Sequence, residues 1–255
     1  PVLEWTEVDI PGDNDLTVVS PSEVTGIAAG RDGLVYVIDG ENGHVYRSVE
    51  YGLDWEDITK YLERAGATMP ATFIAVAPDN QGIVAAVTDG GTAVFVSLDG
   101  GYEWEDVHLP PLSGDVTALA ISGEYVHGDR EYRDLAVGTA SWGDGLSNGQ
   151  VLILQGGCVW GGWRDQEIAV DPAVIGADVS ALAFSPSYAR EHTLVVVAST
   201  GSDVATYPNS TRLCLGERNK GAGTTDWAAF TGYPLEIIDA GDAVGVRLDQ
   251  TALHI

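Results

Sequence analysis

Short apolar segments, separated by turn-forming residues, recur along the whole chain. They are rich in β-branched and aromatic residues, as strands are, and they are bounded by Asp-Gly and Gly-Gly pairs that favour tight turns. All are far shorter than the roughly 20 apolar residues that a membrane-spanning helix requires. The pattern predicts many short strands, with helix as a minor component and no transmembrane helix. Examples are residues 34–38, 45–48, 83–88 and 93–97.

A tryptophan phrase repeats at intervals of about 50 to 60 residues, the length of one unit of a repeat protein. It begins at Trp5, Trp55 and Trp104, with weaker echoes at Trp163 and Trp227. A second phrase, made of small and apolar residues, recurs at the same position in each repeat. Its composition is typical of an inner strand. Two further strand-like segments lie between the phrases, so each repeat contains four strands. The second phrase occupies residues 25–29, 72–76, 117–121 and 180–184.

A four-stranded repeat of this length, punctuated by tight turns, is the sequence form of a β-propeller blade. The predicted fold class is therefore all-β: a β-propeller of four-stranded antiparallel blades, with about four blades and partial blades at both ends. The blades are expected at residues 24–62, 72–110, 116–168 and 178–230, and the partial blades at residues 1–10 and 240–255.

The two ends of the chain do not match complete blades. Trp5 belongs to an outer-strand phrase that no blade precedes, and residues 243–248 have the character of an innermost strand. Either the two end strands close one ring, or the native propeller continues beyond Ile255. We expect the second arrangement, in which the chain is part of a larger protein.

Two turns share a spacing of hydroxyl, carboxyl, glycine and tryptophan residues, reading S-V-E-Y-G-L-D-W from Ser48 and S-L-D-G-G-Y-E-W from Ser97. Both resemble the Asp box, S-x-D-x-G-x-[ST]-W, of sialidase-like β-propellers. In such a turn the Ser and Asp side chains bond backbone amides, Gly adopts a positive φ and Trp packs between blades. The turn residues implied by the resemblance are Ser48, Glu50, Gly52, Trp55, Ser97, Asp99, Gly101 and Trp104.

The chain also departs from the Asp-box pattern. Glu50 replaces the Asp of the first copy, and Asp54 and Glu103 replace the usual Thr or Ser. A degenerate third copy precedes Trp163, and the fourth blade has none. The resemblance covers residues 1 to about 170 and implies a fold rather than an activity, because this architecture serves sialidases, xyloglucan-cleaving glycosidases, sorting receptors, an assembly factor and microbial surface proteins.

Few groups of residues in the sequence have the composition and spacing of a catalytic site. Sialidases need clustered arginines, a Tyr–Glu nucleophile and an Arg-Ile-Pro signature, and the ten arginines here are scattered. No histidine pair has metalloprotease spacing, and no serine lies in a G-x-S-x-G turn. A role outside catalysis is favoured. The most prominent carboxylates occupy equivalent blade positions, which indicates a repeated solvated strand: they are Glu56, Asp57, Glu105 and Asp106.

Three tryptophans, Trp142, Trp160 and Trp163, lie among glycines. Such rings either stack against a carbohydrate or pack between blades. Packing is the favoured interpretation.

The charge is strongly acidic, with 38 Asp and Glu against 12 Lys and Arg and a net charge of −26. Such a chain repels nucleic acid and anionic lipid, and direct membrane insertion is not expected. Acidity favours solubility, basic partners or divalent cations. Oxygen-rich turns make Ca²⁺ the one candidate ion, although Asx turns explain the same residues. The candidate calcium ligands are Asp13, Asp15, Asp144 and Asn148.

The sequence also contains two cysteines and one sequon, and the sequon is typical of an exported protein. Cys158 and Cys214 are the only cysteines and form either one disulfide, the favoured alternative, or two free thiols. Asn209 begins an N-x-[ST] glycosylation sequon. The expected location is extracellular or at the cell surface.

The leading hypothesis is a non-enzymatic extracytoplasmic propeller with a structural, assembly or adhesive role, for example in a cell envelope or surface layer. Its partners would be other proteins or further copies of itself. One alternative is a carbohydrate-active enzyme, a glycoside hydrolase of Asp-box propeller type whose site is completed by a missing part. Another is a propeller that binds a glycan or a peptide, in the latter case a basic one.

Overall fold

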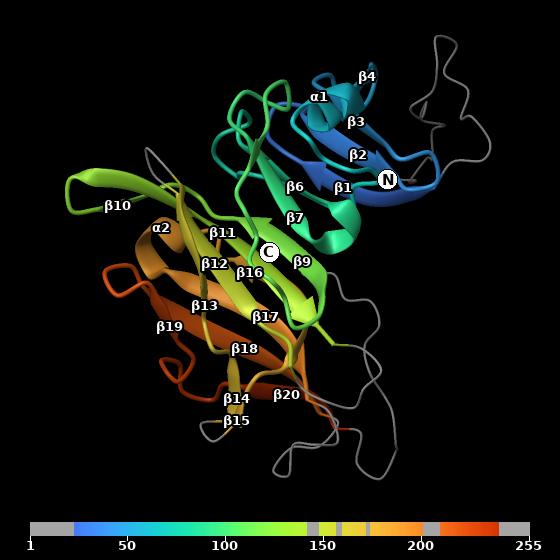
Figure 1. Cartoon of the computed structure of the whole chain (residues 1–255). Coiled ribbons are helices and arrows are strands. Elements are labelled where there is room, and N and C mark those ends of the chain that lie inside the picture. Colours follow the sequence, from blue (N-terminus) through green and yellow to red (C-terminus); the bar gives the residue numbers. More distant parts are fainter. Residues whose placement is uncertain (1–22, 142–147, 157–159, 172–173, 201–209, 240–255) are drawn as a thin grey trace, which may run out of the picture. The chain divides into compact units, whose positions relative to one another are not determined.

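The computed structural model describes residues 23–141, 148–156, 160–171, 174–200 and 210–239, which are nearly all β (Figure 1). Of these described residues, 23–76 and 80–106 form one compact unit, and 77–79 together with those from 107 to 239 form the other. Among the described residues, each unit holds two antiparallel sheets of four or five strands. The predicted β-propeller fold is confirmed. The end segments 1–10 and 240–255 lie outside the described residues.

In the first unit, consecutive strands pair as neighbours, giving the orders β1-β2-β3-β4 and β5-β6-β7-β8. The second strand of each sheet is buried almost throughout, so its sequence is continuously apolar rather than alternating. Helix α1 (Thr59–Arg64) follows the first sheet, and a 3₁₀ turn (Asp89–Gly91) precedes β7. The strands are β1 (Val24–Ala29), β2 (Val35–Asp39), β3 (His44–Ser48), β4 (Glu56–Asp57), β5 (Phe73–Val76), β6 (Val84–Thr88), β7 (Ala93–Ser97) and β8 (Glu105–Asp106).

The third sheet, in the second unit, is built around the long strand β11 (Arg130–Ala140). One edge of β11 pairs with β12, and the other pairs with β9 over its second half and with β10 over its start. Strands β10 and β11 thus form a β-hairpin, which extends from its sheet in Figure 1. Gly128, with φ of +64°, permits its tight turn. The remaining strands are β9 (Asp115–Ile121), β10 (Tyr125–His127), β12 (Val151–Gly156) and β13 (Trp160–Asp165).

The fourth sheet has the order β16-β17-β18-β19, and β20 also pairs with β18. A short two-stranded ribbon precedes it, and helix α2 (Tyr188–Glu191) joins β16 to β17. One apolar core is shared by the third and fourth sheets. The elements are β14 (Ala169–Asp171), β15 (Val174–Ile175), β16 (Asp178–Phe184), β17 (Thr193–Ser199), β18 (Ser210–Asn219), β19 (Thr224–Asp226) and β20 (Leu235–Asp239).

Candidate functional site

The serine of each box-like segment organises a hairpin turn in the first unit. Ser48 Oγ accepts hydrogen bonds from the amides of Glu50 and Gly52, at 3.2 and 2.9 Å. Ser97 Oγ accepts one from the amide of Gly101, at 2.8 Å. Gly52 and Gly101 have φ of +85° and +101°, a region that side chains disfavour. In both turns these residues serve local folding.

The carboxylate position differs between the two turns. Asp99 Oδ1 accepts hydrogen bonds from the Ser97 hydroxyl and from the amides of Tyr102 and Glu103, at 2.7, 3.0 and 2.9 Å. Burial acts to raise the Asp99 pKa, but hydrogen bonds from the Glu103 amide and the Ser97 hydroxyl hold the pKa below its usual value. From the described residues the Glu50 carboxylate receives no hydrogen bond. Its longer side chain does not reproduce the contacts of Asp99.

The second turn also ties the two sheets of its unit together. The Tyr36 hydroxyl, on β2, donates to the carbonyl of Gly100 at 2.9 Å. A Cβ at Gly101 would lie 2.9 Å from the side chain of Ile58, so glycine permits this close packing. Trp55 and Trp104 each donate their indole N–H to the box glycine three residues earlier, at 2.7 and 2.8 Å.

The prominent carboxylates of the first unit are engaged in ordinary surface contacts. Glu56 accepts a 2.9 Å hydrogen bond from the hydroxyl of Tyr102, which in turn accepts one from Arg47. Asp57 contacts His44 Nδ1 at 2.9 Å, where both side chains are more than two-fifths exposed. Glu56 and Asp57 form the short strand β4 at the edge of its sheet, and Asp57 is exposed.

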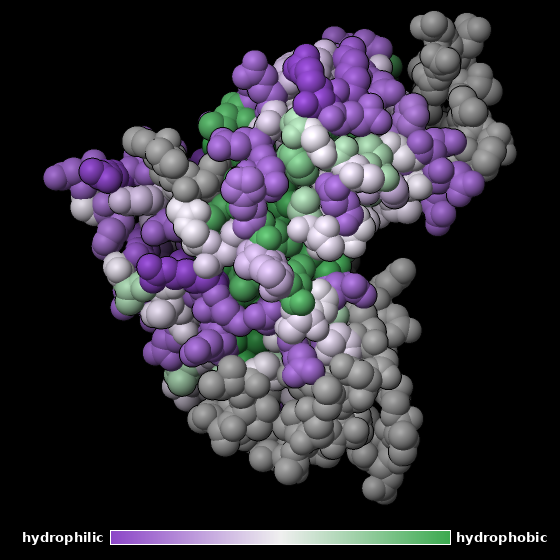
Figure 2. Space-filling model, viewed as in Figure 1, coloured by the Kyte–Doolittle hydropathy of each residue, from purple (hydrophilic) through white to green (hydrophobic). Residues whose placement is uncertain are grey.

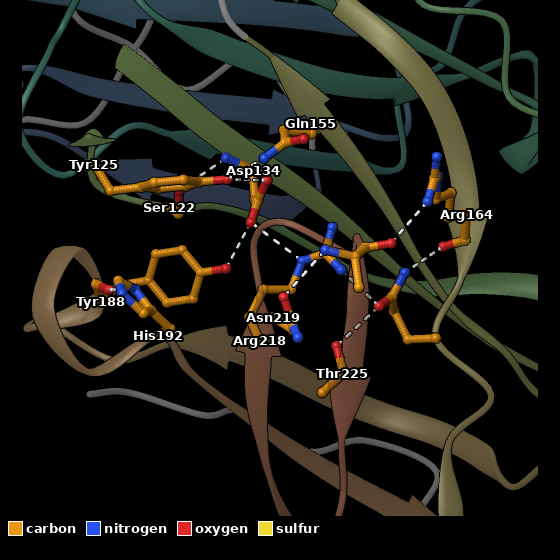
Figure 3. Close-up of polar contacts among 12 residues, drawn as sticks. Ser122, Tyr125, Asp134, Gln155, Arg164, Tyr188, His192, Arg218, Asn219 and Thr225 are labelled. Carbon is orange, nitrogen blue, oxygen red and sulfur yellow. Dashed lines mark hydrogen bonds and ion pairs between the residues drawn. The ribbon is translucent and has the colours of Figure 1, made fainter. Parts of the chain in front are cut away.

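A buried polar cluster in the second unit surrounds Asp134 (Figure 3). Asp134 is 0% exposed although it begins the apolar run of β11. Its Oδ1 accepts a 2.9 Å hydrogen bond from Tyr125 on β10. Its Oδ2 accepts bonds from Tyr188 on α2, at 2.6 Å, and from Arg218 Nε on β18, at 3.4 Å. A buried carboxylate is tolerated when a cation and several donors compensate it, as here.

The two tyrosines of this cluster are held in their protonated form. Burial, and then the negative charge of Asp134, raise the pKa of Tyr188 and of Tyr125 well above the ordinary value of 10.0. A phenol with a raised pKa keeps its proton at neutral pH, and the protonated form is a poor nucleophile and a poor base. The cluster is therefore suited to holding β10, β11, β18 and α2 together.

Gln166 makes further hydrogen bonds that fix the position of Arg218. Its Oε1 accepts hydrogen bonds from Arg218 Nη1 and from the hydroxyl of Thr225, both at 2.9 Å. Its carbonyl accepts the indole N–H of Trp227 at 2.8 Å. The Arg218 side chain is only 1% exposed, and these contacts set its position.

A shallow pocket of about 140 Å³ lies beside this cluster. Three cations converge on it: Arg164 from β13, Arg218 from β18, and Lys220 from the turn after β18. The Lys220 ammonium lies 4.5 Å from the ring centroid of Tyr125, a cation–π contact. Arg164 Nη1 donates a 2.9 Å hydrogen bond to the carbonyl of Ala222. The lining residues are Ile153, Gln155, Gly161, Gly162, Arg164, Arg218, Lys220, Gly221 and Gly223.

Most of the predicted calcium, disulfide and glycosylation residues lie outside the described residues, so these assignments stay predictions. Of the candidate calcium ligands only Asn148 is described; it is exposed, and its carbonyl accepts a hydrogen bond from Ser113. No group of three His, Cys, Asp or Glu within the described ranges is arranged to hold a metal ion. The predictions at Asp13, Asp15, Asp144, Cys158 and Asn209 lie outside the described residues.

Cys214 and Trp163 occupy packed positions. The Cys214 side chain is buried, and burial raises the pKa of its thiol to about 12. Its pairing with Cys158 stays a prediction. Trp163 is half-buried and donates its indole N–H to the carbonyl of Val107 at 2.9 Å, a contact typical of packing. Trp142 lies outside the described residues.

The sequence did not single out Asp134, Tyr125 or Arg218. One signal was available: Asp134 directly precedes the apolar segment 135–137, where an unpaired carboxylate would be costly. Its partners could not be read from the sequence, because Tyr188 and Arg218 are 54 and 84 residues away.

Comparison with known proteins concerns the fold alone. No family model matches the sequence, and no curated protein matches it. Solved structures resemble the chain. They include YCF48 bound to D1 peptide (11% identity, 82% of this chain and 54% of that chain, TM-score 0.41) and the GH74 enzyme of Niastella koreensis (18%, 80% and 29%, TM-score 0.47). Hydrazine synthase of Kuenenia stuttgartiensis is a third (12%, 88% and 51%, TM-score 0.48).

The likeness is one of fold. The chain spans about half or less of the length of these three proteins.

Neither of the two described α-helices, of six and four residues, has the length and apolar character needed to cross a membrane.

Proposed function

We propose that this chain is part of a non-enzymatic β-propeller of the Asp-box type, exported to the cell surface, with a role in assembly or adhesion. The observation that carries the proposal is a set of exposed apolar side chains on both box-like hairpins. Val49 and Leu98, which follow the two box serines, are 50% and 64% exposed. Tyr51 and Leu53, on the first hairpin, are 76% and 66% exposed. Exposed apolar residues that lie together mark interaction sites, and three of these four lie within five residues of the chain.

The buried chemistry also supports a role outside catalysis. Asp134 has its oxygens occupied by Tyr125, Tyr188 and Arg218, and the raised pKa of each tyrosine keeps its proton in place. These groups stabilise the fold and are not free to exchange protons with a substrate.

Acidity gives the proposed assembly a dependence on cations. At a net charge of −26, copies of the chain repel one another at low ionic strength. Hydrophilic residues cover much of the visible surface in Figure 2. Calcium held by Asp13, Asp15, Asp144 and Asn148 would reduce this repulsion, and basic partners would do the same.

The proposal is tested by light scattering and electron microscopy of the full chain, in millimolar calcium and with a chelator. We expect regular assemblies in calcium that the chelator disperses. The double variant Val49→Ser/Leu98→Ser should weaken assembly, whereas Val126→Ser, which removes a side chain 61% exposed elsewhere, should not. A monomer under both conditions, or glycan hydrolysis by the pure protein, would overturn the proposal.

A ligand-binding propeller is the second candidate function. The basic pocket at Arg164, Arg218 and Lys220 favours it, because converging cations are unusual in so acidic a chain. This function does not require assembly and can be tested separately.

A further inference from the structure

Three of the 12 basic residues of the chain line one pocket in the second unit. All nine lining residues are described, and none of them is acidic. With 38 acidic side chains available, the cations would be expected to pair with carboxylates on the surface. Their convergence without a lining carboxylate makes the lining of this pocket electropositive.

Arg218 and the other two cations have different roles there. The charge of Arg218 is offset by Asp134, and its guanidinium is held by Asp134 and Gln166. Among the described residues, no carboxylate lies within ion-pair distance of Arg164 or Lys220. Lys220 makes a cation–π contact with Tyr125 and a long 3.5 Å contact with the carbonyl of Val126. The pocket therefore has two positive charges that its own residues do not neutralise.

Glycines keep the pocket open and allow backbone to approach. A Cβ built at Gly162 would meet no atom within 4 Å, so this residue borders open space. Gly223 has φ of +70°, and a Cβ there would lie 2.8 Å from Arg164 Nη1. Any other residue at Gly223 would be strained and would displace the guanidinium. The absence of a side chain at Gly223 thus leaves room for the Arg164 guanidinium at the pocket.

We propose that this pocket binds one oxyanionic group, a carboxylate, sulfate or phosphate, between Arg164 and Lys220. The planar guanidinium can donate two parallel hydrogen bonds to such a group, and the ammonium adds a point charge. The pocket, of about 140 Å³, is smaller than the cavities of roughly 300 to 1,000 Å³ that enclose whole ligands. It therefore anchors the acidic group of a larger ligand whose remainder lies outside.

The test is a titration of the full chain with sodium sulfate, sodium phosphate and sodium glucuronate, at constant ionic strength maintained with sodium chloride. Binding is followed by NMR at the amides of Gly161, Gly162, Gly221 and Gly223. We expect saturable shifts at these amides with at least one anion, and the anion that binds tightest identifies the source as sulfate, phosphate or carboxylate. Absence of saturation with all three, or shifts spread over the surface, would overturn the proposal.

Variants distinguish specific binding at this pocket from general charge screening. Arg164→Gln and Lys220→Gln should each weaken binding about tenfold while leaving the buried contacts of Arg218 intact. Arg190→Gln removes a cation whose side chain is 81% exposed, and Lys60→Gln removes an ammonium 4.8 Å from the ring of Tyr61, a match for Lys220 over Tyr125. These two controls should bind as the parent does. Equal losses in all four variants would show screening alone and would overturn the proposal.

Discussion

Tyr188 donates a 2.6 Å hydrogen bond to the buried carboxylate of Asp134, which lies 54 residues earlier in the chain. The bond joins helix α2 to the middle of strand β11 and thereby links two sheets of the second unit. Hydrogen bonds to buried charged groups are among the stronger ones in proteins. The stability of this unit should depend on the pair.

Tyr188→Phe should destabilise the chain by about 1.5–3 kcal/mol, because the substitution removes one donor from a buried carboxylate and keeps the ring. Urea denaturation followed by tryptophan fluorescence measures the change. Tyr132→Phe is the matched control: that ring stacks on Tyr125, and its hydroxyl has no hydrogen bond to the described residues. Equal, small effects of the two variants would contradict the role given to Asp134.

Alkaline pH should destabilise the fold through the same tyrosines. Tyr125 and Tyr188 have a pKa raised above 10.0 in the folded chain, so their contribution is complete below pH 10.0 and is lost as pH rises above it. Each unfolded tyrosine that ionises lowers the free energy of unfolding by about 1.4 kcal/mol per pH unit. Urea titrations between pH 9 and about 11 should show this slope. Tyr188→Phe removes one of these tyrosines, so the slope should fall by the contribution of one tyrosine. An unchanged slope would contradict the raised pKa of Tyr188.

Glu50→Asp should stabilise the first box-like turn. The shorter side chain can accept amide hydrogen bonds as Asp99 does in the second turn, which would add about 0.5–1.5 kcal/mol to the free energy of unfolding. Denaturation in urea gives the difference. Glu50→Gln keeps the length and should give no gain, so a gain in both variants would point to charge rather than turn geometry.

Cys214 should resist alkylation in the folded chain. Burial raises its pKa to about 12, and the thiolate is the reactive form. In Cys158→Ser the remaining thiol should react with an alkylating reagent only after denaturation, as mass spectrometry would show. Rapid labelling of the folded variant would contradict the buried position.

The same reagent tests the predicted disulfide. If Cys158 and Cys214 pair, the oxidised parent protein contains no reactive thiol even when denatured, and reduction releases two. If two thiols of the denatured protein are labelled without a reductant, both cysteines are free and the predicted disulfide is wrong.

Local interactions explain why the sequence predicted the blades and the box-like turns. Ser97 reaches the Gly101 amide only four residues later, and Ser48 reaches Gly52 over the same span. Such contacts depend on spacing alone, so they can be recognised before the fold is known. Hairpin pairing of consecutive strands is equally local, which is why the repeat identified a propeller blade.

The Asp134 cluster and the basic pocket were decided by tertiary structure. Arg218 lies 84 residues from Asp134, and Arg164 is brought to Ala222 across 58 residues. No spacing rule relates such residues, because their meeting depends on how two sheets pack and on the register of each strand. The sequence by itself determined the repeated β architecture, since most strands in it pair with the next strand along the chain. Tertiary packing alone decided where the few cations of an acidic chain converge, since it places side chains from distant strands at one point.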